Sequence, residues 1–345
     1  MMLARGSVLK VNNINVLIIL TTFLAVLLST TAIPFGYFHL AWSVAVAYST
    51  LAQCIIPLCL LICGYLVLNE PIPAARTVLA RMLKLLIILL FWSVIYTGLR
   101  HLINQFDPQS EVNTLFILLV GQFKWVIPVF LLLLLLTPLL NTFVITASRQ
   151  RTRYMMLVWF VLASVYLLFS NIRSELIHSN TVIESSTLEL TVYLAGFYLA
   201  GGAIRRFHIQ TNVRLSGIIF CLAWVATATM TYALSVNMVS PNRSFLFYSS
   251  PLLVVMAVSL FFMLLEYPFT VGGRISKLLD TLAQLSVSIF LTHLLVLPLM
   301  LWMMAIDFNN YSAAYTIPVV AMVCFVVSAG LCWLITSLPL LRRLR

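Results

Sequence analysis

The sequence predicts an all-α integral membrane protein in which residues 1–345 form a single bundle of about ten transmembrane helices. Three observations support this fold class: an apolar composition, a series of long apolar runs, and a one-sided distribution of basic residues. Hydrophobic residues make up 62% of the 345 residues, charged residues make up 8%, and the mean hydropathy is +1.08. Soluble domains carry about 25% charged residues. The chain therefore has too few charges to cover a water-facing surface.

Apolar runs near the length that crosses a bilayer, about 20 residues, recur along the whole chain. Ten of them are predicted to span the membrane: 14–33, 43–68, 83–103, 125–144, 154–169, 188–204, 215–236, 245–265, 282–305 and 315–338. The fifth and sixth are shorter than the rest. A further run, 115–123, is too short to cross, so we interpret it as an interfacial or re-entrant helix that leads into the fourth span.

The distribution of basic residues supports this helix count. With the amino terminus in the cytoplasm, 16 of the 20 Lys and Arg residues fall on the cytoplasmic side and 4 on the opposite side. This asymmetry is the positive-inside pattern, and it predicts that both termini are cytoplasmic. The net charge of +11 is then explained by topology and by contact with anionic lipid headgroups. No nucleic-acid partner is expected.

Cofactor and metal motifs are missing from the sequence. The six cysteines all fall in predicted spans, and none pairs with histidines in a metal-ligand pattern. Neither GxxxxGK[ST] nor GxGxxG occurs, so no ATP or dinucleotide site is predicted. We expect no metal site and no bound cofactor.

Ionisable residues within a membrane are costly, and they are functional candidates for that reason. His293 lies near the middle of the ninth span, where an imidazole is suited to act as a general base towards a hydroxyl. The alternative is a neutral histidine that is hydrogen-bonded within the core. In either case we expect His293 to face the bundle interior, near Tyr65 or the fourth span.

Arg76 and Arg81 lie where the chain enters the third span from the cytoplasmic side. One interpretation is that they snorkel to the headgroups and help to set the topology. The other is that they bind an anionic ligand, such as the phosphates of a coenzyme A donor. Glu70 ends the second span and is expected among the cytoplasmic headgroups, near Arg76.

Several motifs occur in the order that one membrane-protein family shows. Residues 56–66, with Pro57 and Gly64-Tyr65, resemble its P-x-F-F-x-I-S-G-Y-L segment in the second span, and 76–92 resemble its arginine-bearing entry to the third. Residues 124–140 are similar to its H-L-W…L-[TS]-P-L segment, 192–201 to F-x-L-G-Y-x-L-G, and 286–293 to S-x-G-I-Y-L-x-H. The chain thus resembles the acyltransferase 3 family of membrane acyltransferases across most of its length.

The resemblance implies transfer of an acyl group, acetyl or succinyl, from a cytoplasmic acyl-CoA co-substrate to a sugar hydroxyl of a surface or periplasmic glycan. It also implies a multi-pass protein of the bacterial inner membrane that modifies polysaccharide by O-acetylation or a related reaction. The family pattern has a histidine in the first span and an arginine upstream of it. Here these positions are Ser29 and Ile18, and the histidine expected before Trp125 is Phe123. His293 is the clearest remaining member of the polar set.

Two function classes follow. The first is a membrane O-acyltransferase that uses His293, with Arg76 and Arg81 at the donor. In that case Ser29 is the positional substitute for the missing histidine, and it needs an activating neighbour within about 2.6–3.2 Å. The second class is a non-catalytic relative that binds or exports a glycan or a lipid-linked sugar. Membrane lipids are partners in both classes, and the sequence does not specify the acyl group, the acceptor or the oligomeric state.

Overall fold

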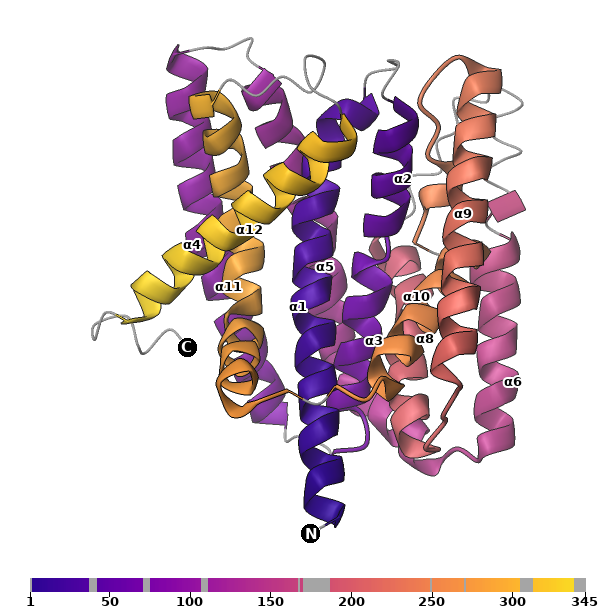
Figure 1. Ribbon diagram of the computed structural model, residues 1–345. Helices are drawn as coiled ribbons and strands as arrows, with labels where there is room; N and C mark the ends of the chain where they lie inside the picture. The colour runs from indigo at the N-terminus through magenta and orange to yellow at the C-terminus, as the bar shows by residue number, and fades with distance from the viewer. Residues whose placement is uncertain are drawn as a thin grey trace. The chain divides into compact units, whose positions relative to one another are not determined.

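The computed structural model describes residues 2–36, 42–70, 75–106, 111–166, 168–169, 187–248, 250–269, 271–304 and 313–337. Every regular element in these ranges is a helix (Figure 1). Eight helical segments are long and apolar enough to cross a membrane: Asn12–Gly36, Trp42–Val67, Arg76–Leu99, Pro128–Thr146, Val213–Met238, Ser244–Glu266, Gly273–Met304 and Ala313–Ser337. They match eight of the ten predicted spans.

The predicted spans 154–169 and 188–204 are not among these eight. The first of them corresponds to α6 (Arg149–Phe160), which has three arginines in its first five residues, and to the π-helix η1 (Val161–Tyr166). The second corresponds to α8 (Thr187–Arg206), which ends on two arginines. The run 115–123 is not a separate interfacial helix, because it lies inside the continuous helix α5 (Glu111–Thr146).

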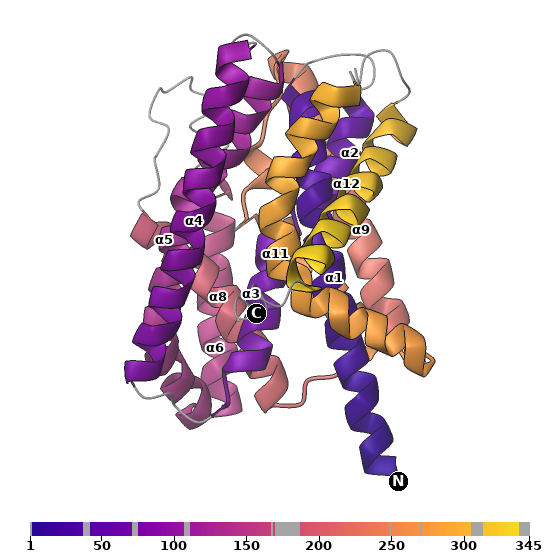
Figure 2. The same cartoon turned by 90° about the vertical axis from the view of Figure 1, so that its left-hand side faces the viewer.

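The chain divides into two compact units. The first unit contains Met1–Ile55, Trp92–Gly121 and Tyr267–Arg345. In it α1 packs against α2, α11 and α12, and α11 packs against α12 (Figures 1 and 2). The bounds of these helices are α1 Met2–Gly36, α2 Trp42–Ala52, α11 Gly273–Met304 and α12 Ala313–Ser337.

Polar side chains join α1 to the first turns of α11. The amide of Asn15 donates to Asp280 Oδ1 at 2.5 Å, and the hydroxyl of Ser276 donates to Asn12 Oδ1 at 3.0 Å. Residue numbers rise together along the two helices, so α1 and α11 run parallel. Two membrane spans that run in the same direction must have an odd number of other spans between them along the chain. The ten predicted spans meet this condition for α1 and α11, and so do the eight candidate spans of the structure.

The second unit contains Ile56–Phe91 and Gln122–Glu266. Here α9 packs against α10, and α6 packs against α8. The long helices α4 and α5 each contribute one part to this unit and one part to the first. The bounds not yet given are α3 Ile55–Val67, α4 Ala75–Phe106, α9 Val213–Met238, η2 Ser244–Leu246 and α10 Pro251–Glu266.

Glycines bring the backbones of α3 and α8 into close contact in the second unit. A Cβ atom at Gly64 would lie 1.8 Å from the carbonyl oxygen of Tyr198, and one at Gly201 would lie 2.1 Å from that of Leu61. Neither site has room for a methyl group. Membrane helices associate through such small-residue contacts, because lipid provides no hydrophobic driving force between them. The glycines of two of the family-like motifs therefore have a packing role.

Candidate active site

Ser29 of α1 and His293 of α11 meet inside the first unit. The Oγ atom of Ser29 lies 3.1 Å from the Nε2 atom of His293. Ser29 is 8% exposed and His293 is 1% exposed. The predicted interior position of His293 is thus confirmed. Its predicted proximity to Tyr65 or the fourth span stays a prediction, because those residues belong to the second unit.

The hydroxyl of Ser29 differs from the other hydroxyls in the described part of α1. Thr21, Thr22 and Thr30 each donate to the carbonyl four residues earlier, and Thr31 donates to the carbonyl three residues earlier. That back-bonding is the usual way for a membrane helix to satisfy a hydroxyl. Ser29 has a side chain on another helix as its partner instead. Its direction is therefore set by packing between α1 and α11.

Contacts from neighbouring helices hold α11 in place around His293. Thr292 Oγ1 lies 3.3 Å from Cys332 Sγ of α12, and the thiol of Cys324 points at the His293 carbonyl oxygen at 3.9 Å. The ring of Phe290 lies 5.6 Å from the imidazole, centroid to centroid. The histidine therefore has neighbours on its own helix and on α12 as well as on α1. The imidazole itself contacts Ser29 and the ring of Phe290, and Nε2 is directed at Ser29.

The second ring nitrogen of His293 has no carboxylate partner among the described residues. Nδ1 is buried, and within the described ranges it makes no hydrogen bond of acceptable geometry. The arrangement is therefore a serine–histidine dyad, and it lacks the acidic third member that orients the histidine of a hydrolase triad.

Tyr96 is a buried polar residue that sequence reasoning missed. Its hydroxyl donates to the carbonyl oxygen of Leu291 at 2.6 Å, and the side chain is 3% exposed. The contact fixes the second part of α4 against α11, two residues before His293. A tyrosine in the middle of an apolar span was the available signal, but one sequence does not reveal which helix it faces.

The predicted donor-site residues lie at the start of α4, in the second unit. Arg76 is exposed, and the side chain of Arg81 lies outside the described residues. Their role towards a donor stays a prediction. Two further departures from the family pattern are Ile18, which is half-buried on α1, and Phe123, whose backbone lies in α5 and whose side chain is not described.

Glu70 has an ion-pair partner that the sequence did not suggest. Its carboxylate lies 2.6 Å from Nη2 of Arg205 on α8, whereas Arg76 was the expected neighbour. Nη1 of Arg205 also donates to the carbonyl oxygens of Tyr65 and Leu66, at 3.2 and 3.0 Å. These carbonyls belong to the last turn of α3, where the helix dipole favours a cation. Arg205 therefore acts as a clamp between α3 and α8.

Asn141 of α5 closes the same turn from a third helix. Its Oδ1 accepts from the backbone N–H of Asn69 at 2.8 Å, and its amide donates to the Glu70 carbonyl oxygen, also at 2.8 Å. Asn69 adopts a left-handed conformation with φ of 80°, which asparagine tolerates better than most residues. The chain thus leaves α3 through a tightly hydrogen-bonded turn.

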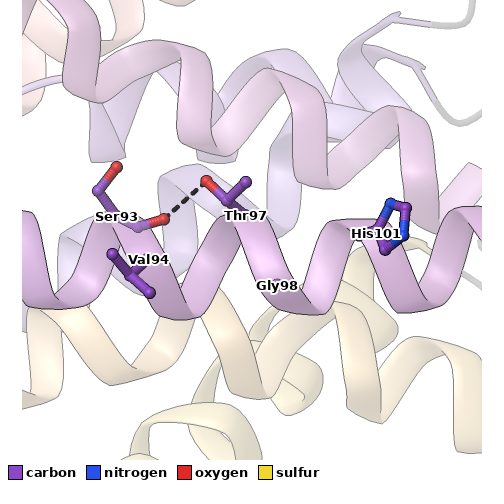
Figure 3. A pocket seen from close by; sticks show the side chains of 5 residues that line it. All are labelled: Ser93, Val94, Thr97, Gly98 and His101. Carbon is purple, nitrogen blue, oxygen red and sulfur yellow. Dashed lines mark hydrogen bonds between the residues drawn. The ribbon is translucent and has the colours of Figure 1, made fainter.

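An open groove of about 400 Å³ runs along the second part of α4. Figure 3 shows the residues that line it: Ser93, Val94, Thr97, Gly98 and His101. The hydroxyl of Thr97 donates to the Ser93 carbonyl oxygen at 2.8 Å, so its proton is already used within the helix. Ser29 and His293 do not line this groove. Among the described residues, no group of three His, Cys, Asp or Glu side chains is placed to hold a metal ion.

The chain was compared with protein families, with curated proteins and with solved structures. The model of the acyltransferase 3 family, described as an acyltransferase domain, matches residues 12–337. Neither a curated protein nor a solved structure matches the chain significantly. The family match extends from the start of the first candidate span to the end of the last, and it includes both Ser29 and His293. The chain therefore belongs to the acyltransferase 3 family.

Proposed function

We propose that this chain is a membrane-embedded O-acyltransferase. It transfers an acyl group, acetyl or succinyl, from a cytoplasmic acyl-CoA to a sugar hydroxyl of a surface or periplasmic glycan. The proposal places it in a bacterial inner membrane with ten spans and both termini in the cytoplasm. Family membership supports the reaction class, and the excess of basic residues on one side supports the orientation.

The observation that carries the proposal is the buried contact between Ser29 and His293. An imidazole 3.1 Å from a hydroxyl has the geometry that general-base catalysis requires. Stability alone is a weak reason for the pair, because a hydrogen bond between membrane helices contributes about 0.6 kcal/mol on average. A buried histidine opposite a serine in a chain of this family is therefore best explained by proton transfer at a hydroxyl.

For the donor, we propose that Arg76 and Arg81 bind the phosphates of acyl-CoA. Both arginines belong to the first two turns of α4, five positions apart, and the guanidinium group suits bidentate binding of phosphate. Arg76 is exposed and has the access that a charged ligand needs. The exposed Arg214 at the start of α9 is a matched control, because it has the same charge and a similar position in its helix.

A second candidate function is supported by the departures from the family pattern. Ile18, Ser29 and Phe123 occupy positions where the resemblance expects an arginine and two histidines. A chain that had lost catalysis but kept the fold would bind or export a glycan or a lipid-linked sugar. In that case Ser29 and His293 would form only a structural link between α1 and α11.

The experiment compares surface glycans by mass spectrometry in cells with and without the chain, and in cells that carry His293→Ala, the double variant Arg76→Ala/Arg81→Ala, or Arg214→Ala. We expect an acyl mass increment that depends on the chain. It should disappear with His293→Ala, fall with the double variant and persist with Arg214→Ala. Glycans of identical mass in all strains would contradict the enzyme proposal. If glycan export changed while acylation did not, the second candidate would replace the first.

A further inference from the structure

We infer that Ser29 is the nucleophile of the reaction and carries the acyl group as an ester on Oγ, with His293 as its base. The chain would then work by double displacement, and the acyl group would leave coenzyme A before it meets the sugar. This inference rests on the proposed acyltransferase function and adds a covalent site to it.

The first argument is the occupancy of the basic nitrogen. A neutral imidazole has one nitrogen that accepts a proton and one that carries a proton. Nε2 faces Ser29 Oγ at 3.1 Å, so a sugar hydroxyl cannot take that place without displacing the serine. A base that is already engaged by a serine hydroxyl activates that hydroxyl first. This is the arrangement of an activated nucleophile with its base.

The second argument concerns the tautomer. Nδ1 is the ring nitrogen nearer to its own backbone, and it has no hydrogen-bond partner among the described residues, whereas Nε2 faces Ser29 Oγ. The proposed reaction uses the tautomer with its proton on Nδ1, which leaves the lone pair on Nε2 towards the serine. Ser29 is then the hydrogen-bond donor and His293 the acceptor. The opposite tautomer would make Nδ1 the base and would leave Ser29 a bystander.

The third argument is the direction of the Ser29 side chain. The described threonines of α1 satisfy their hydroxyls on the backbone of their own helix, and Ser29 has the same option open to it in principle. Its hydroxyl instead meets the imidazole of α11. The hydroxyl of Ser29 is therefore hydrogen-bonded to a base on another helix. A serine nucleophile requires such a base within hydrogen-bond distance of its Oγ.

The reaction balances with acyl-CoA and a sugar alcohol alone. In the first step Ser29 Oγ attacks the thioester carbonyl, the carbon–sulfur bond breaks, and the serine proton passes through Nε2 to the departing sulfur to give free coenzyme A. In the second step the sugar oxygen attacks the serine ester. The sugar proton passes through Nε2 to Oγ, the carbon–Oγ bond breaks, and the serine is restored.

The test uses the purified full-length chain in nanodiscs with acetyl-CoA or succinyl-CoA and no sugar. Double displacement predicts that radiolabelled coenzyme A exchanges into acyl-CoA under these conditions. It also predicts an acyl mass increment on the peptide that contains Ser29. We expect Ser29→Ala to abolish both signals and His293→Gln to reduce exchange by about 100-fold or more, the usual contribution of a general base. Thr30→Val removes a neighbouring hydroxyl that bonds only to its own helix, so both signals should remain.

Ser29→Cys distinguishes a lost nucleophile from a misfolded protein. The cysteine should accept the acyl group as a thioester that neutral hydroxylamine releases, whereas the wild-type ester should resist neutral hydroxylamine and yield only at high pH. Chain-dependent glycan acylation that persists in cells with Ser29→Ala would overturn this inference and leave the proposed function standing. If neither exchange nor chain-dependent glycan acylation is found with the wild-type chain, both the inference and the proposed function fail.

Discussion

The close approach of α3 and α8 predicts a large effect for Gly201→Ala. The added Cβ would lie 2.1 Å from the Leu61 carbonyl oxygen and 2.8 Å from the Tyr65 nitrogen, whereas ordinary contact begins at 3.4 Å. Both opposing atoms belong to backbone, so no side-chain rotation relieves the clash, and the helices must separate by about 1 Å. Overpacking of this kind costs about 1–3 kcal/mol. We expect a clear fall in the melting temperature of the second unit.

Gly330→Ala on α12 provides the matched control. Nothing lies within 4 Å of a Cβ atom at that position. The substitution there changes only helix propensity, which favours alanine over glycine by up to about 1 kcal/mol. The two variants should therefore shift stability in opposite directions when they are measured by thermal unfolding of the purified chain in the same detergent. A Gly201→Ala variant that melts at or above the wild-type temperature would refute the close packing of α3 and α8.

Three further predictions follow from other parts of the chain. Arg205→Lys should destabilise the second unit by about 0.5–1 kcal/mol, because an ammonium group cannot reproduce the guanidinium hydrogen bonds to two carbonyls and Glu70. A variant as stable as wild type in thermal unfolding would show that Arg205 does not hold α3 and α8 together. Asn141→Leu should cost about 1 kcal/mol, since it leaves two partly buried backbone groups of the turn after α3 without their partner. Unchanged thermal unfolding would show that the turn does not need this side chain. A reporter fused after Arg345 should report the cytoplasm and one inserted within 104–113 the opposite side, and a periplasmic signal at Arg345 would exclude the proposed topology.

Much of the helical architecture could be predicted from hydropathy, because the cost of exposing backbone to lipid forces apolar segments into long helices. Eight predicted spans reappear for this reason. The fifth predicted span differs from these eight, because the segment at α6 starts with several arginines and changes to a π-helix after Phe160. Length and hydropathy also cannot separate the run 115–123 from the helix that follows it. The structure shows one continuous helix there.

The candidate site was partly predictable as well. The high cost of an imidazole in lipid predicted that His293 would be buried, and the family resemblance singled out Ser29. The contact between the two side chains could not be predicted, because it depends on how α1 and α11 are rotated about their axes. One sequence does not reveal that rotation. Tyr96 and Arg205 were missed for the same reason: their partners lie 195 and 135 residues away in the chain.

The pairing of α1 with α11 has a consequence for biogenesis. Three polar contacts among the described residues of these helices each join residues 264 or 265 positions apart. At about 5–20 residues per second, the ribosome needs on the order of tens of seconds to produce α11 after α1. During that interval Asn12, Asn15 and Ser29 have no α11 to meet, and an unsatisfied polar group in lipid is costly. The nascent first helix must therefore remain near the insertion machinery or contact another helix transiently. A chain truncated before α11 should be a substrate for membrane quality control.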